Sequence, residues 1–258
     1  MTSRPLAACD PARTRRRVLV IAAAVAAVAL AAAGTLLAAR RPNHACRGAE
    51  VALVGVWDPA RKAALHDAFL ATKMPYAEHA WETVEKKLDA YTAAWVAMHQ
   101  DACEASSVRQ VQSAEVMDRR MICLGARLGE VRAVTDLFAR ADAKVVENAT
   151  AAAGSLASLD GCADVAALMA PVAPPRDEVA RAKVAAARDQ VARAKALEKA
   201  GKPMEGLEVA KTAVEAARAA GYRPVEAEAL LELGFLQEGD PKAAEQTLIE
   251  AFEAATEP

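Results

Sequence analysis

The chain has 258 residues, of which 54% are hydrophobic, 26% charged and only 4% aromatic, and its formal net charge is −2 at pH 7. Charges of both signs are mixed along it, so no basic patch that would bind nucleic acid is expected. Alanine, leucine, glutamate, lysine and arginine dominate, and this composition predicts an all-α protein.

An apolar segment near the N-terminus is the most informative feature of the sequence. Residues 18–39 contain no charged side chain, and arginines stand on both sides of them. As a helix this segment would be about 33 Å long, enough to cross a hydrocarbon core of about 30 Å. A cleaved secretory signal is the main alternative, but its apolar core usually has only about 7–15 residues. We therefore predict a single transmembrane helix over residues 18–39.

The arginine distribution predicts the orientation of this helix. Five arginines precede it in residues 1–17, and three follow it in residues 40–47. Since positively charged flanks favour the cytoplasmic side, residues 1–17 are predicted to form a short cytoplasmic tail. The rest of the chain, residues 40–258, is then expected to lie outside the cytoplasmic membrane.

The cysteines agree with this placement. Beyond the apolar segment stand Cys46, Cys103, Cys123 and Cys162, an even number in a compartment that is predicted to be oxidising. Disulfides are favoured over four free thiols, and three pairings are open. No cysteine belongs to a CxxC pair and no histidine stands at zinc-ligand spacing, so neither a metal site nor a cofactor is expected.

Residues 40–170 are predicted to form a disulfide-containing helical bundle. Asp58-Pro59 is a typical helix start, for a helix that would run to about Ala71. Apolar residues at helical spacing then predict a helix over about residues 77–102. These residues are Trp81, Val84, Leu88, Tyr91, Trp95 and Met98. We interpret them as a core stripe rather than as an aromatic ligand platform.

Two further helices are expected in the bundle, from about Ser107 to Arg140 and from about Asp142 to Leu159, each with one narrow apolar face. The turn between them would bring Cys123 and Cys162 to similar heights on neighbouring helices. Cys103 would lie at the start of the second helix, more than about 20 Å from Cys123 and beyond disulfide reach. We therefore favour the pairs Cys46–Cys103 and Cys123–Cys162.

The C-terminal region is predicted to contain tetratricopeptide-like helical repeats over residues 177–258, after a proline-rich linker at residues 171–176. Ala210, Val214 and Ala217 recur 34 positions later as Ala244, Leu248 and Ala251. The helices are expected at Asp177–Ala200, Met204–Ala219, Val225–Gln237 and Pro241–Ala255. Two helix pairs are fewer than the three repeats usually needed, so they should dock on the bundle, dimerise or be marginally stable.

The groove between the repeat helices is the predicted binding site for a protein or peptide partner. Its candidate polar residues are Lys211, Arg218, Arg223 and Glu232.

With these parts placed, the chain resembles the region after the kinase domain in receptor-type bacterial Ser/Thr protein kinases, especially the myxobacterial set. The resemblance covers nearly all of residues 14–258 and includes the repeats. Its local motifs include Cys46-Arg47-Gly48, Val56-Trp57-Asp58, Pro75-Tyr76-Ala77, Ala102-Cys103-Glu104-Ala105, Arg120-Met121-Ile122-Cys123-Leu124 and Gly161-Cys162-Ala163-Asp164. The resemblance implies an extracytoplasmic region that senses or binds another molecule.

The sequence departs from such kinases before the apolar segment. Only 17 residues precede it, and the chain has no glycine-rich phosphate loop, no His-Arg-Asp catalytic loop and no Asp-Phe-Gly motif. No catalytic residue is therefore assigned, and we expect a membrane-anchored interaction or sensor module without catalysis. Its expected partners are a protein or peptide, a second copy of the chain, or related receptor kinases. The alternatives are a truncated fragment of a kinase gene and an unrecognised envelope enzyme.

Overall fold

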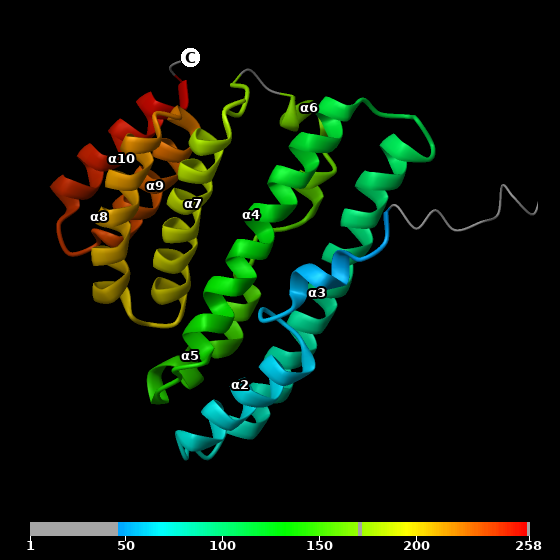
Figure 1. The fold of residues 1–258 in the computed structure, drawn as a ribbon. Helices are drawn as coiled ribbons and strands as arrows, with labels where there is room; N and C mark the ends of the chain where they lie inside the picture. Colours follow the sequence, from blue (N-terminus) through cyan, green and yellow to red (C-terminus); the bar gives the residue numbers. More distant parts are fainter. Residues whose placement is uncertain (1–45, 170–171, 257–258) are drawn as a thin grey trace, which may run out of the picture. The chain divides into compact units, whose positions relative to one another are not determined.

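The structure is a computed structural model that describes residues 46–169 and 172–256 (Figure 1). The predicted cytoplasmic tail, residues 1–17, and the predicted transmembrane helix, residues 18–39, lie outside these residues. Within the described ranges, no helix is both long enough and apolar enough to cross a bilayer.

The described part of the chain is all-α, as predicted, and its nine helices pack through antiparallel neighbours (Figure 1). They are α2 Pro59–Ala71, α3 Ala77–Ser107, α4 Ala114–Phe138, α5 Ala143–Gly154, α6 Val165–Leu168, α7 Glu178–Lys199, α8 Pro203–Ala220, α9 Arg223–Leu236 and α10 Pro241–Thr256. A 3-10 turn, η2 Ala49–Leu53, precedes α2, and another, η3 Asp160–Cys162, lies between α5 and α6.

The first helix of the bundle begins and ends where the sequence predicts. The Asp58 carboxylate accepts hydrogen bonds from the backbone N–H groups of Gly55 (2.6 Å) and Arg61 (2.7 Å), and Pro59 follows at the first helical position. These bonds stabilise the ionised carboxylate, so they lower the pKa of Asp58, with the bond from Gly55 contributing most.

The aromatic stripe of α3 belongs to the core, as expected. Trp81, Val84, Leu88 and Trp95 are buried, whereas Tyr91 and Met98 are half-buried. The Trp81 ring lies 5.6 Å from that of Phe69 between centroids, in an edge-to-face arrangement. The buried indole N–H of Trp95 donates to the backbone oxygen of Leu124, 2.8 Å away, and so joins α3 to α4.

Three helix boundaries differ from the prediction by five residues or more. α3 ends at Ser107 rather than near residue 102, and the start of α4 and the end of α5 differ as well. α4 begins at Ala114 rather than Ser107, because the Ser113 hydroxyl accepts from the N–H of Val116 (3.2 Å) and caps the helix there. α5 ends at Gly154 rather than Leu159, because Ala157 bonds to the bundle instead. Its N–H donates to Glu130 of α4 (2.9 Å), and its carbonyl accepts from the Tyr91 hydroxyl of α3 (2.9 Å).

Both favoured disulfides, Cys46–Cys103 and Cys123–Cys162, are present. Cys103 lies near the C-terminal end of α3 rather than at the start of the next helix, and Cys162 lies in η3 rather than on a helix. Since disulfides form and persist in oxidising compartments, the pair of bonds indicates an extracytoplasmic domain.

The C-terminal helices have nearly the predicted bounds, and they dock on the bundle. α7 pairs with α8 and α9 with α10, while α7 also packs against α4 (Figure 1). The two helices come close at Gly129 of α4, where an added Cβ would lie only 3.0 Å from Asp189 Oδ1 of α7. α4 therefore buries a second face, against α7, in addition to the single narrow face that was predicted.

Candidate functional site: a cleft between α4, α7 and α9

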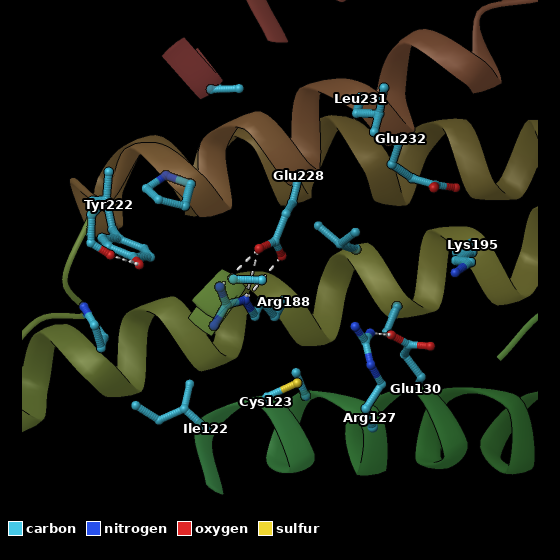
Figure 2. A pocket seen from close by; sticks show the side chains of 18 of the residues that line it. Ile122, Cys123, Arg127, Glu130, Arg188, Lys195, Tyr222, Glu228, Leu231 and Glu232 are labelled. Atoms are coloured by element: carbon cyan, nitrogen blue, oxygen red, sulfur yellow. Dashed lines mark hydrogen bonds and ion pairs between the residues drawn. The ribbon is translucent and has the colours of Figure 1, made fainter. Parts of the chain in front are cut away.

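A cleft of about 810 Å³ lies where α4 of the bundle faces α7 and α9 (Figure 2). Its volume is within the range of pockets that hold ligands, about 300–1,000 Å³. α6 and residues 172–174 complete its lining. The hydroxyl of Tyr222 donates to the backbone oxygen of Val172 (3.3 Å), which holds this connecting segment against the turn before α9.

An ion pair joins α7 and α9 inside the cleft. Arg188 of α7 donates to both carboxylate oxygens of Glu228 on α9, at 2.9–3.3 Å (Figure 2). Burial alone would lower the pKa of Arg188, but the bonds to Glu228 stabilise the charged form and raise it. This bidentate geometry fixes the spacing of α7 and α9 along one wall of the cleft.

The charged residues of α4 are also engaged. Arg127 pairs with Glu130, which accepts the Ala157 bond through its other oxygen. Arg119 donates to Glu115 (3.0 Å) and to the backbone oxygen of Leu168 in α6 (2.9 Å). Each of these arginines therefore has a carboxylate partner within the fold, although the Nε atom of each is buried without a hydrogen-bond partner among the described residues.

Glu232 of α9 lines the cleft without an ion-pair partner among the described residues. It is only 8% exposed, and its Oε1 atom is buried with no hydrogen-bond partner among those residues. Burial raises the pKa of its carboxyl to about 7; Glu198 adds to this effect, while Lys195 and Lys199 oppose it. A buried acceptor without a donor is rare in folded proteins and is a feature of binding sites.

Apolar side chains border this carboxyl. Leu231 and Phe235, one turn apart on α9, also line the cleft and are 45% and 53% exposed. On the facing side of α7 stands the ammonium group of Lys195, which has no hydrogen bond or ion pair within residues 46–169 and 172–256 (Figure 2). The cleft thus combines one buried unpaired carboxyl group, one unpaired ammonium group and an exposed apolar edge.

The structure places one of the four predicted groove residues, Glu232, in the cleft. Lys211 lies on α8 and pairs with Glu208 (2.7 Å), outside the lining. Arg218 and Arg223 meet at Glu226, with contacts of 3.2 Å and 3.1 Å, and they do not line the cleft either.

The sequence reasoning missed the other polar residues of the cleft, among them Arg188, Lys195 and Glu228. Arg188 and Lys195 are seven residues apart on α7, and Glu228 and Glu232 are four residues apart on α9. Each pair therefore lies on one polar face of its helix. Nothing in that spacing shows that these faces turn towards α4.

Among the described residues, no group of three or more His, Cys, Asp or Glu side chains is arranged to hold a metal ion. Comparisons of the chain with protein-family models, with curated proteins and with solved structures each found no match.

Proposed function

We propose that this chain is a membrane-anchored interaction module that binds a segment of a partner protein outside the cytoplasm, in the cleft between α4, α7 and α9. The observation that carries the proposal is the cleft itself, about 810 Å³ in volume and bordered by the exposed side chains of Leu231 and Phe235. Exposed apolar groups beside fixed polar groups are typical of binding surfaces.

The 34-residue period supports this reading of the C-terminal half. If α7–α8 and α9–α10 are two tetratricopeptide-like repeats, α7 and α9 are their first helices, and both line the cleft. Stacked repeats create concave surfaces that bind extended partners. Here α4 covers part of such a surface, and the uncovered remainder is the cleft.

The apolar run at residues 18–39 supports the membrane anchor, and the two disulfides support an extracytoplasmic location for the cleft. The module is single-pass, with its N-terminus in the cytoplasm, and it carries out no catalysis. Its resemblance to receptor kinase ectodomains makes a protein of the same envelope, including a related receptor kinase, the favoured class of partner.

Site-specific photo-crosslinking tests the proposal. A photoreactive residue is placed at Leu231 or Phe235 of the full chain, in membranes washed with alkaline carbonate, and at Lys211 on α8 as a control. Lys211 is exposed but lies outside the cleft. We expect the two cleft positions to give the same discrete protein adduct, and the control position to give none.

The adduct is then identified by mass spectrometry, and the purified partner is titrated against the chain. We expect saturable binding, and we expect a variant of α9 such as Phe235→Glu to weaken it. Loss of the full-length chain from carbonate-washed membranes contradicts the anchor. Equal crosslinking from Lys211 and from the cleft positions contradicts the assignment of the binding site.

A further inference from the structure

The balance of charges in the cleft indicates what the partner segment contributes. Arg188 is paired with Glu228, Arg127 with Glu130, and Lys199 with Glu198 at 2.9 Å. These pairs leave the carboxyl of Glu232 and the ammonium of Lys195 as the two cleft charges without an ion-pair partner in the described part of the chain.

The two unpaired groups are not equivalent, because they differ in burial. Lys195 is half-exposed, and its long side chain keeps its charge in contact with water. Glu232 is 8% exposed, and one of its oxygens is sealed from solvent without a donor. Only Glu232 therefore gains substantially from a ligand that brings a donor into the cleft.

We propose that Glu232 is the recognition residue of the cleft, and that it binds the lysine or arginine side chain of a partner polypeptide whose aliphatic stem packs on Leu231 and Phe235. This inference rests on the proposed function and names the group that the cleft selects. The cation brings both a hydrogen-bond donor and the missing positive charge, so it forms a charge-assisted bond with the carboxyl group of Glu232.

The other charges near Glu232 are balanced within the fold. Glu198 of α7 is paired with Lys199, and Glu228 of α9 is paired with Arg188. The preference for a cation therefore comes from the unpaired carboxyl of Glu232 itself. The apolar edge formed by Leu231 and Phe235 suits the methylene stem that lysine and arginine share.

Lys195 is the competing partner within the chain. Its charge lowers the pKa of Glu232, yet no hydrogen bond or ion pair joins the two side chains. If Lys195 satisfies Glu232 in the free protein, a ligand cation must displace it. Removing the lysine then leaves ligand affinity unchanged or raises it.

The test uses the full chain in detergent micelles and blocked, fluorescently labelled peptides of sequence Leu-Ala-X-Ala-Leu. X is lysine, arginine, glutamate or norleucine, which keeps the aliphatic stem without the charge. Fluorescence anisotropy at pH 8 should show the lysine and arginine peptides binding at least about tenfold more tightly than the norleucine peptide, as expected for a charge-assisted bond.

Three variants make the test specific. Glu232→Gln should remove the preference for lysine over norleucine without weakening the norleucine peptide. Lys195→Gln should keep or strengthen the preference. Glu208→Gln is the matched control, because it neutralises an exposed glutamate of α8 outside the cleft, and it should leave all affinities unchanged.

The possible failures can be told apart. Equal binding of the lysine and norleucine peptides to the unmodified chain overturns the cationic specificity but leaves a peptide-binding cleft. Tightest binding of the glutamate peptide, or a lysine preference that survives Glu232→Gln, also overturns the inference. If no peptide binds, the inference fails, and the proposed function is then decided independently by the crosslinking experiment.

Discussion

Burying an unpaired carboxyl group is costly when that group is ionised, so Glu232 should make the stability of the fold depend on pH. Its pKa is about 7 in the folded chain, compared with an ordinary value of 4.5. Between these pH values the folded state keeps a proton that the unfolded state releases. The contribution to stability is therefore fully present below about pH 4.5 and is lost as the pH rises through 7.

The variant Glu232→Gln tests this dependence, because glutamine has nearly the same shape and no charge. At pH 8 we expect its free energy of unfolding to exceed that of the unmodified chain, by on the order of 1–3 kcal/mol. At pH 4.5 the difference should largely vanish. Urea denaturation curves at the two pH values measure the difference in free energy of unfolding between the variant and the unmodified chain. The same difference at pH 4.5 and pH 8 would show that Glu232 ionises normally in the fold.

Arg120 shows how the same fold treats a buried charge that serves structure. It is only 6% exposed, and it donates to the backbone oxygen of Cys162 (3.2 Å), to Gln112 (3.2 Å) and to Asp101 (2.9 Å). The bond from Arg120 is the main reason that the pKa of Asp101 is lowered. Glu232 differs from Arg120 in having no ion-pair partner among the described residues, and its buried Oε1 atom accepts no hydrogen bond there.

At the scale of elements, glycines set how closely the C-terminal helices pack. A Cβ added at Gly234 of α9 would lie 2.7 Å from Cγ and Cδ2 of Leu248 on α10. Such overpacking costs about 1–3 kcal/mol, more than the gain in helix propensity of about 1 kcal/mol. We therefore expect Gly234→Ala to lower the free energy of unfolding by about 1–2 kcal/mol.

Gly125→Ala in α4 is the matched control. Gly125 is exposed in mid-helix, and an added Cβ there would meet nothing within 4 Å. This change should raise the free energy of unfolding by up to about 1 kcal/mol through helix propensity alone. Urea midpoints of the two variants should move in opposite directions. A stabilising effect of Gly234→Ala would mean that α9 and α10 can separate without loss.

Helix positions were predictable because caps and spacing are local signals. Asp58-Pro59 marks the start of α2, and the 34-residue period places the C-terminal helices within a few residues of their observed bounds. Where a side chain contacts a distant segment, the prediction was wrong. α5 ends early because Ala157 bonds to Glu130 and Tyr91, and nothing near Ala157 in the sequence indicates those partners.

The cleft was harder to predict than the helices that form it. Three of the four predicted groove residues lie outside it. Lys211 and Arg218 belong to α8, which does not line the cleft, and Arg223 stands at the start of α9, where it pairs with Glu226. A signal for the true arrangement was present in the small residues Ala126, Gly129 and Ala133 on one side of α4, which allow α7 to approach. Spacing alone reveals such a surface but not which helix packs against it.

At the scale of the whole described region, covalent and packing constraints act on different parts. Cys46–Cys103 ties the segment before α2 to α3, and Cys123–Cys162 ties η3 to α4. No disulfide reaches α7–α10. Those helices are held by packing instead, and Ala192, Ala196 and Leu197 of α7 share a buried cluster with Val134 and Leu137 of α4.

Because packing rather than a disulfide holds α7–α10, we predict that the C-terminal helices depend on the bundle for their stability. A fragment of residues 177–258 would expose the α7 face that α4 now covers, and two helix pairs are fewer than repeat arrays usually require. We expect this fragment to melt without a sharp transition or at a clearly lower temperature than residues 46–258. The longer fragment keeps the α4–α7 interface and should unfold in one cooperative step.

Circular dichroism melts of the two fragments, with the disulfides intact in the longer one, provide the comparison. Ala196→Glu in residues 46–258 is the companion test, because it buries an unpaired charge in the α4–α7 interface, where Ala196 is 3% exposed. It should lower the melting temperature and separate the transition of α7–α10 from that of the bundle. If the 177–258 fragment instead melts cooperatively at the same temperature as the longer one, the repeat helices are self-sufficient. The cleft would then be a contact between two independent parts rather than a site formed by one fold.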